Sequence, residues 1–453
     1  MNEHFVTLPP TKLFFRCAIP AMIGMIVSAS YAIADGIFVG HFIGSEALAA
    51  VNLIMPFTLI AFSLADMIAV GSSVRISMFL GQGKHKDANQ TFSFCLKVIF
   101  LISILIGIVG FLLGGPLLEL MGAEALVLQY AQEYLCVYAI FAPGVMLFFA
   151  TDNYLRICGK EKYSMAIIVF TSVLNIILDF LLIVVWKQGV WSAALASCLS
   201  MTLGTVLSLA PFLHKKLDLH FTHGNISPSQ FMKLLANGSS EFFSSIAGST
   251  MSIIINAILL AIGGTTAVAA ISVVMYADNI VNMLIFGMVS SLQPAISYCY
   301  GAGLQKRVKA LQKRIIVAAA LLSLLAFFFM RYGGGLVVPL FVQPDDSALL
   351  TMSMTAMSLY AFAYLVNWVD GCLSGYLTAL EHPGRSLAVS LLGTIVFPTI
   401  CLALMVPSLG LNGVWLMPFA AGILSAIAAL VAVNTLKQKD YRILTINKER
   451  GDC

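Results

Sequence analysis

The sequence predicts an all-α integral membrane protein with twelve transmembrane helices. Hydrophobic residues make up 60% of its 453 positions and charged residues only 10%, whereas soluble domains carry about 25% charged residues. Apolar windows of about 20 residues or more, enough to cross a bilayer, recur along the whole chain. We expect the helices at roughly residues 13–40, 48–80, 91–114, 126–157, 163–186, 189–213, 231–262, 267–300, 310–330, 347–379, 385–406 and 413–436.

The placement of basic residues predicts the orientation of these helices. With the N-terminus inside, 22 of the 25 Lys and Arg residues fall on inner segments. Only Lys187 and Arg331 fall on outer segments, and Arg75 lies near the inner end of the second helix. Because cytoplasmic segments collect Lys and Arg, we expect a multi-pass protein of a bacterial-type plasma (inner) membrane with both termini in the cytoplasm.

The two halves of the chain resemble each other. Each half holds six spans, so the copies are parallel, as in transporters whose two bundles rock about a central site. We therefore expect an N-terminal six-helix bundle over residues 1–213, a cytoplasmic linker over 214–230, a C-terminal six-helix bundle over 231–436 and a cytoplasmic tail over 437–453. The clearest recurring pairs are Gly44 with Gly264, Ala47 with Ala267, Met55 with Met275, Gly83 with Gly303 and Ser164 with Ser386.

Two acids inside apolar runs predict an ion-coupling site in the first half. Asp35 closes the first span, where a charge costs at least roughly 2.5–3.5 kcal/mol and therefore usually has a function. Asn175 and Asp179 are four residues apart and share one face of the fifth helix. Asp35 and Asp179 lie at similar depth, and two acids brought close together favour a retained proton or a shared cation. We expect Asp35, Asn175 and Asp179 to bind H⁺ or Na⁺, the alternative being two acids that cap unrelated backbone groups.

Proline inside the first helix predicts a bend. Pro20 lies fifteen residues before Asp35, about 22 Å along an ideal helix. A proline there frees a carbonyl and kinks the helix. We expect Pro20 to act as a hinge that lets this helix change shape when Asp35 changes charge, the alternative being a static kink.

Further polar residues in the spans predict a substrate cavity. Asp278 with Asn282, and Trp368 with Asp370, combine a carboxylate with an amide or an aromatic ring, which suits a flat organic cation. Hydrogen bonding between helices is the alternative for each. The candidates for this cavity are Asp66, Ser197, Asp278, Asn282, Trp368 and Asp370.

At the inner end of the fourth helix, Asp152 and Arg156 are spaced for an ion pair. We expect this pair to be structural, with an arginine that extends toward the membrane surface.

No motif of soluble enzymes appears in the sequence. The run Gly81–Lys84 lacks the spacing of a phosphate-binding loop, and the seven histidines are scattered. We expect no enzymatic activity, no cofactor, no nucleic-acid partner and no metal beyond Na⁺ at Asp35 and Asp179. A lipid-linked saccharide or lipid flippase of the same architecture stays open, although a flippase tends to need basic residues for phosphate and this interior mainly offers acids. A membrane-embedded transferase would need an acid-rich loop or a histidine cluster.

Over nearly its whole length the chain resembles the multidrug and toxic compound extrusion (MATE) family. The resemblance rests on the two six-helix halves, on Ile19-Pro20, on the run Ala34–Gly40 and on Asn175-Ile176-Ile177-Leu178-Asp179. The last two are similar to motifs of the DinF-like branch. The resemblance implies a V-shaped pair of bundles and an antiporter that couples H⁺ or Na⁺ to the export of cationic and amphipathic compounds. It also implies that Asp35, Asn175 and Asp179 line a cavity of the N-terminal bundle. We expect small organic cations as substrates, the lipid bilayer as surroundings and a monomer.

Overall fold

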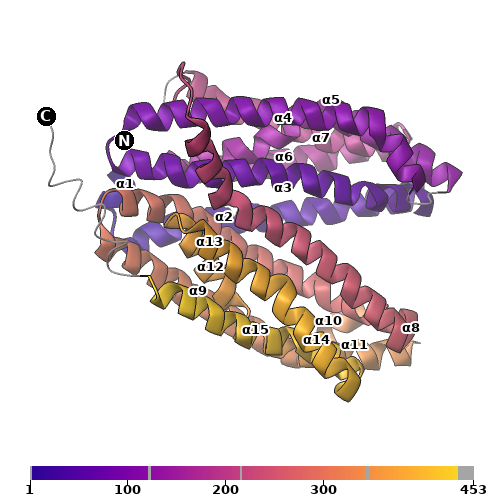
Figure 1. Ribbon diagram of the computed structural model, residues 1–453. Coiled ribbons are helices and arrows are strands. Elements are labelled where there is room, and N and C mark those ends of the chain that lie inside the picture. Colours follow the sequence, from indigo (N-terminus) through magenta and orange to yellow (C-terminus); the bar gives the residue numbers. More distant parts are fainter. Residues whose placement is uncertain (1–2, 121–123, 215–216, 343–345, 437–453) are drawn as a thin grey trace, which may run out of the picture. The chain divides into compact units, whose positions relative to one another are not determined.

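The computed structural model describes residues 3–120, 124–214, 217–342 and 346–436. These residues form helices joined mostly by short turns, with a longer non-helical segment over 217–227, and none of them lies in a strand (Figure 1). The predicted all-α fold is therefore confirmed. The predicted tail, residues 437–453, lies outside the described residues.

Two helical series follow each other along the chain. The first contains α1 (Glu3–Thr7), α2 (Pro10–Phe38) with the π-helical η1 (Val39–Ile43), α3 (Ser45–Gly81), α4 (His85–Leu120), α5 (Ala125–Ile157), α6 (Glu161–Asp179) with the π-helical η2 (Phe180–Val185), and α7 (Trp191–Leu213). The second contains α8 (Pro228–Gly301), α9 (Gln305–Tyr332), α10 (Gly334–Val337), η3 (Val338–Leu340), α11 (Ser347–Tyr360) with η4 (Ala361–Leu365), α12 (Trp368–Ala379), α13 (Pro383–Leu391) with the π-helical η5 (Leu392–Val396), α14 (Phe397–Leu409) and α15 (Leu411–Asn434).

Eleven helices of the described chain are long and apolar enough to cross a membrane. One of them, α8, is 74 residues long and contains Gly264 in a non-helical conformation where two helices meet. Counted on both sides of Gly264, α8 supplies two spans. The predicted twelve spans are therefore confirmed.

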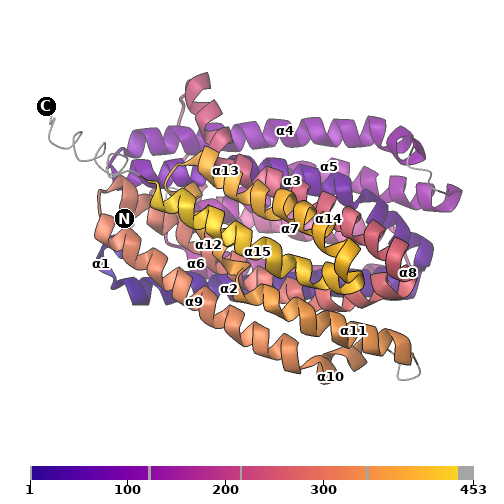
Figure 2. The same ribbon diagram turned by 60° about the horizontal axis from the view of Figure 1, so that its bottom comes forward.

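The chain divides into two compact units. The N-terminal unit contains Met1–Leu8 and Ile19–Gly238, and the C-terminal unit contains Pro9–Ala18 and Ser239–Cys453. In the N-terminal unit α5 packs against α3, α4 and α7, and Figure 1 shows these helices running alongside one another. In the C-terminal unit α15 packs against α11, α12 and α14, which Figure 2 shows at the front of the view.

These units differ from the predicted boundaries because two helices are shared between them. The start of α2 belongs to the C-terminal unit, and the start of α8 belongs to the N-terminal unit. A Cβ atom at Gly238 would lie 1.8 Å from the carbonyl oxygen of Met67 on α3, so only glycine permits this close contact. The linker before α8 also packs on the N-terminal unit, where the backbone N–H groups of His220 and Thr222 donate to Asn89 and Ser93 of α4 at 2.8 and 2.9 Å.

The turns of the two halves repeat in their backbone geometry. Gly44 and Gly264 both have positive φ angles, as do Gly83 and Gly303 at 76° and 74°. The remaining positive-φ residues of the described chain form two further pairs, Gly159 with Glu381 and Lys187 with Gly410, at offsets of 222 and 223 residues. The positive-φ residues of the described chain therefore recur at corresponding positions of the two halves, as a structural duplication requires.

Candidate functional site

The predicted ion-coupling residues come from two neighbouring helices of the N-terminal unit. Asp35 lies in the last turns of α2, four residues before η1, and Asp179 ends α6 where η2 begins. Both acids therefore adjoin π-helical segments, which are rare and occur frequently at functional sites. A π-helical turn leaves some carbonyls without their usual helical partners and changes the direction of the side chains that follow.

The carboxyl groups of Asp35 and Asp179 lie close enough to interact with each other. Two neighbouring carboxylates repel each other when both are ionised, so such a pair favours a retained proton or a shared cation. Oδ1 of each acid is buried and has no hydrogen-bond partner within the described chain. Asp179 is fully buried and Asp35 is half-buried. The pair thus offers unsatisfied oxygen atoms to a proton or a small cation.

Asn175 connects this pair to α7. With its amide nitrogen toward Asp179, Asn175 donates to Oδ2 of that acid at 3.1 Å. In the same orientation its oxygen accepts hydrogen bonds from the backbone N–H and the hydroxyl of Ser197, at 3.2 and 2.9 Å. Carboxylate, amide and hydroxyl oxygens are hard ligands suited to a cation without strong geometric demands, so these four residues could hold Na⁺ as well as H⁺.

A small cavity of about 40 Å³ adjoins Asn175 and Ser197. Tyr31, Ser200 and Thr171 also line it, whereas the two acids do not. This volume exceeds the roughly 10–15 Å³ that one water molecule needs. Tyr31 and Tyr134 lie near enough to Asp35 to interact with its charge. The cavity is therefore large enough to hold water next to the amide end of this site.

Two adjoining cavities lie in the C-terminal unit. One has a volume of about 310 Å³, and Glu241, Trp368 and Asp370 are among its lining residues. The other has a volume of about 680 Å³ and includes Asp278 and Tyr276 in its lining. The two share Asn282, Asn367 and Thr394 as lining residues. Both volumes fall within or near the range of ligand pockets.

The acids of these cavities are held in position by hydrogen bonds. Asp278 accepts from the hydroxyl of Tyr364 and the amide of Asn282, each at 2.8 Å. Asp370 accepts from the hydroxyl of Ser425 at 2.9 Å and from the backbone N–H of Gly371 at 2.7 Å. Among the described residues that line the two cavities there is no Lys or Arg. The lining therefore carries net negative charge whenever these acids are ionised.

A glycine in η5 makes room for Asp370. A Cβ atom at Gly393 would lie 2.5 Å from Oδ2 of Asp370 and 2.4 Å from Oγ of Ser425. Any other residue would displace the hydrogen bond between these two side chains.

Comparison with known proteins identifies the chain. The family model MatE matches residues 20–181 and 242–403, two stretches of equal length set 222 residues apart. The chain belongs to the MATE family of transporters. The duplicated match also agrees with the repeat seen in the turns.

Individual MATE proteins are similar along almost the whole chain. Multidrug export protein MepA of Staphylococcus saprophyticus is 24% identical over 440 residues, which cover 96% of this chain and 95% of that protein. A crystal structure of MATE in the bent conformation has a TM-score of 0.88 at 24% identity, covering 96% of this chain and 98% of the other. A crystal structure of MATE in the straight conformation has a TM-score of 0.88 at 23% identity, covering 98% of each chain. These structures share the fold of this multi-pass membrane protein.

The remaining predicted residues of this MATE protein have different surroundings. Pro20 lies inside α2, two residues after Ala18, where the chain passes from the C-terminal to the N-terminal unit. Asp66 is half-buried on α3 and lines none of the cavities described above. Ser197 belongs to the site in the N-terminal unit. The C-terminal cavities are lined by the other four candidates, Asp278, Asn282, Trp368 and Asp370.

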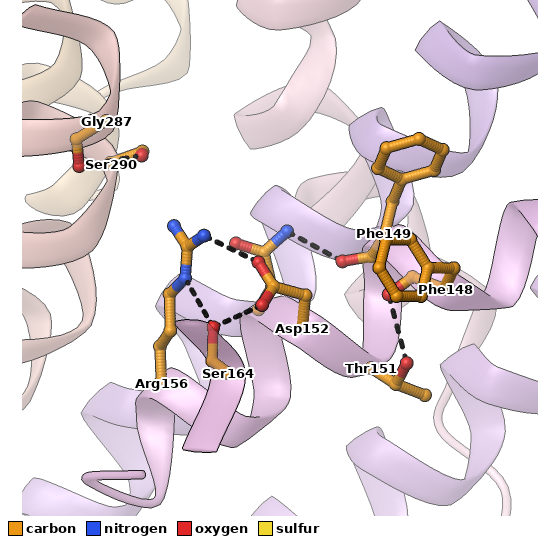
Figure 3. Close-up of polar contacts among 9 residues, drawn as sticks. Phe148, Phe149, Thr151, Asp152, Arg156, Ser164, Gly287 and Ser290 are labelled. Carbon is orange, nitrogen blue, oxygen red and sulfur yellow. Dashed lines mark hydrogen bonds and ion pairs between the residues drawn. The ribbon is translucent and has the colours of Figure 1, made fainter. Parts of the chain in front are cut away.

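Asp152 and Arg156 form the predicted ion pair, at 2.6 Å. Figure 3 shows both side chains with Ser164 of α6, whose hydroxyl donates to Asp152 and lies 3.5 Å from Nε of Arg156. The arginine side chain is only 5% exposed. The expectation that it extends to the membrane surface was therefore wrong, because Ser164 and Asp152 satisfy it inside the protein.

Several residues of these sites were not predicted from the sequence. Ser425 and Gly393 adjoin Asp370, and Tyr31 and Tyr134 surround Asp35. For Ser425, Tyr31 and Tyr134 the signal in the sequence was a polar residue in an apolar helix, which serine and tyrosine show too often to be singled out. For Gly393 there was no signal in the sequence.

Proposed function

We propose that this MATE transporter exports organic cations in exchange for H⁺ or Na⁺, with the ion bound at Asp35 and Asp179. The observation that carries the proposal is the pair of neighbouring acids in the N-terminal unit, each with a buried and unsatisfied Oδ1. The C-terminal cavities provide a separate acidic space for a cationic substrate. The name of the similar MepA protein, which exports multiple drugs, supports this class of substrate.

In this mechanism the ion changes the shape of α2. An arriving ion reduces the negative charge of the pair and so weakens the repulsion between the two acids at the ends of α2 and α6. Pro20 lacks a backbone N–H and allows α2 to bend between its two packing environments. A ligand drives transport when it binds one conformation more tightly than another. The ion therefore favours the conformation that binds substrate weakly, and its gradient drives export.

The orientation follows from the distribution of basic residues. Lys and Arg gather on the segments that include both termini, so we place the termini and the linker in the cytoplasm. Substrate then moves outward while the ion moves inward down its gradient.

Transport with each ion gradient imposed separately tests this function. The protein is reconstituted in liposomes, and uptake of tetraphenylphosphonium into inside-out-oriented vesicles is measured with a proton gradient alone or a Na⁺ gradient alone. We expect uptake against the substrate gradient with at least one of the two. Absence of uptake with both gradients, together with binding of a polyprenyl phosphate in place of the organic cation, would favour the flippase alternative instead.

The charge of Asp278 is expected to contribute to the binding of organic cations in the C-terminal cavity. Asp278→Asn keeps the shape of the side chain and removes its charge, so the affinity for tetraphenylphosphonium should fall about tenfold or more, which corresponds to roughly 1.4 kcal/mol. Affinity is measured by equilibrium binding to purified protein. Triphenylphosphine oxide, a neutral compound of similar size, is the control and should bind wild type and variant alike. An equal loss for both compounds would mean that Asp278 only supports the structure.

A further inference from the structure

A groove of about 560 Å³ runs along α9 in the C-terminal unit, next to the start of α2. Thr11, Phe14 and Phe15 of α2 form one wall, and α9 forms the other with Lys313 and Arg314 at one end. Residues 9–18 belong to the same compact unit as α9. The groove is therefore a feature of one unit, separate from the acidic cavities.

The basic end of the groove is held in place. Nε of Arg314 donates to the hydroxyl of Thr11 at 2.9 Å, and Nη1 donates to the carbonyl oxygen of Ala310 at 2.7 Å. Lys313 is exposed beside it. The sequence contains no Asp or Glu between residues 4 and 34 or between 279 and 344. Neither helix therefore offers an acid along the groove, since Asp35 of α2 lies more than 20 residues after Thr11.

The rest of the groove is apolar. Val317 and Leu321 follow Lys313 at intervals of four residues and so continue along the same face of α9. From Lys313 to Leu321 this stripe is about 12 Å long. Leu321 is 59% exposed and Phe15 is 53% exposed. The groove thus has a cationic end and an open apolar channel.

An organic cation would be repelled by Lys313 and Arg314, so this groove does not suit the substrates proposed above. Basic pockets on the cytoplasmic side of transmembrane helices suit the head groups of anionic lipids, and long basic side chains reach from apolar surroundings to the phosphate level. We propose that the groove binds one anionic phospholipid, with its phosphate at Lys313 and Arg314 and one acyl chain along Val317 and Leu321.

Such a lipid would stabilise the part of α2 that precedes Pro20. Phe14 and Phe15 lie six and five residues before this proline, and their rings pack edge to face at 5.3 Å. An acyl chain in the groove contacts both walls and holds the first turns of α2 against α9. The lipid composition therefore influences the helix that carries Asp35 without contacting the ion site.

A second groove provides a comparison within the chain. It lies along α4 and α5, has a volume of about 430 Å³ and is lined by apolar residues such as Ile108, Phe111 and Ile140. Without a charged end it can accept an acyl chain but cannot select a head group. Binding of zwitterionic lipid there sets the background against which selective binding is measured.

Native mass spectrometry of the delipidated full chain tests the proposal. Phosphatidylglycerol and phosphatidylcholine of identical acyl chains are added, and the dissociation constants of the first bound lipid are compared. Wild type should bind phosphatidylglycerol roughly tenfold more tightly or better, and salt should weaken this preference. The double variant K313Q/R314Q should lose the preference. K160Q/K162Q removes the same amount of charge from exposed positions at the start of α6. This control variant should keep the preference for phosphatidylglycerol.

A third variant separates the groove from general electrostatic attraction. Ala318→Trp fills the channel but leaves Lys313 and Arg314 in place, so it should also weaken the binding of phosphatidylglycerol. Thermal unfolding of each variant without lipid checks that it folds. The proposal is overturned if the two lipids bind wild type equally or if K313Q/R314Q keeps the preference. It is also overturned if Ala318→Trp binds like wild type, or if millimolar inorganic phosphate alone displaces the phospholipid.

Discussion

Replacing Asp35 with asparagine is expected to abolish ion-driven efflux while leaving the protein folded and inserted. Asparagine has the same shape as a protonated aspartate, so Asp35→Asn leaves a permanently neutral partner for Asp179. The site then lacks the second acid that shares the ion, so arrival of the ion no longer relieves repulsion between two carboxylates. Because ion and substrate are linked through one conformational equilibrium, the substrate affinity should lose its dependence on the ion, an effect that in coupled systems is typically about 5–150-fold.

Efflux in reconstituted vesicles and substrate binding with and without the ion both measure this effect. Asp179→Asn should cause the same loss, and the double variant should be no worse than either single one, since the two acids act as a unit. Glu133→Gln is the matched control, because it neutralises a carboxylate on α5 whose hydrogen-bond partner is Gln129. Gradient-driven export by Asp35→Asn at the wild-type rate would refute the role of the pair.

The acids of this site could be predicted because a carboxylate is rare in an apolar run. Asp35 and Asp179 stand out in their apolar runs for this reason, and the four-residue spacing places Asn175 on the same face as Asp179. Their meeting depends on the packing of α2 against α6, which spacing within one helix cannot reveal. Tyr134 was missed for the same reason, since it reaches Asp35 from α5. Tyr31 lies four residues before Asp35 on α2, so its spacing could have indicated it.

The spans could be predicted more fully than the units. Hydropathy and helix length fix where a segment crosses the bilayer, and the twelve spans followed. The boundary between units depends instead on contacts such as that of Gly238 with Met67. Both α2 and α8 are continuous apolar helices in the sequence, so nothing marks the residue at which each passes from one unit to the other. The π-helical segments after Asp35 and Asp179 are equally hidden, because their sequences resemble ordinary helix.

The repeat explains how the two halves can share a framework and differ in chemistry. Asp152, Arg156 and Ser164 correspond to Ser374, Thr378 and Ser386 at an offset of 222 residues. The first set forms the buried ion pair with a hydroxyl. The second forms a cluster of hydroxyls, in which Oγ of Ser374 and Oγ1 of Thr378 lie 3.0 and 2.7 Å from Oγ of Ser386. The same helix junction is thus joined by charge in one half and by neutral hydrogen bonds in the other.

This difference predicts the largest stability effect in the chain. Asp152→Asn removes the carboxylate from Arg156, whose side chain is 5% exposed. Breaking one side of a buried ion pair typically destabilises a protein by about 3–5 kcal/mol, because a buried charge loses its partner. In the hydroxyl cluster Thr378→Val should cost only about 1 kcal/mol, the usual contribution of a neutral hydrogen bond. Thermal and denaturant-induced unfolding, followed by intrinsic fluorescence in the same detergent, measure both changes.

A double variant separates the charge effect from lost packing. In Asp152→Asn with Arg156→Met neither member of the pair carries a charge, and an apolar side chain of similar length fills the space of the arginine. Replacement of a whole buried pair by apolar groups is often neutral or stabilising, so the double variant should be more stable than Asp152→Asn alone. If the two losses simply add, Asp152 and Arg156 stabilise the N-terminal unit through separate contacts, and the ion pair itself contributes little.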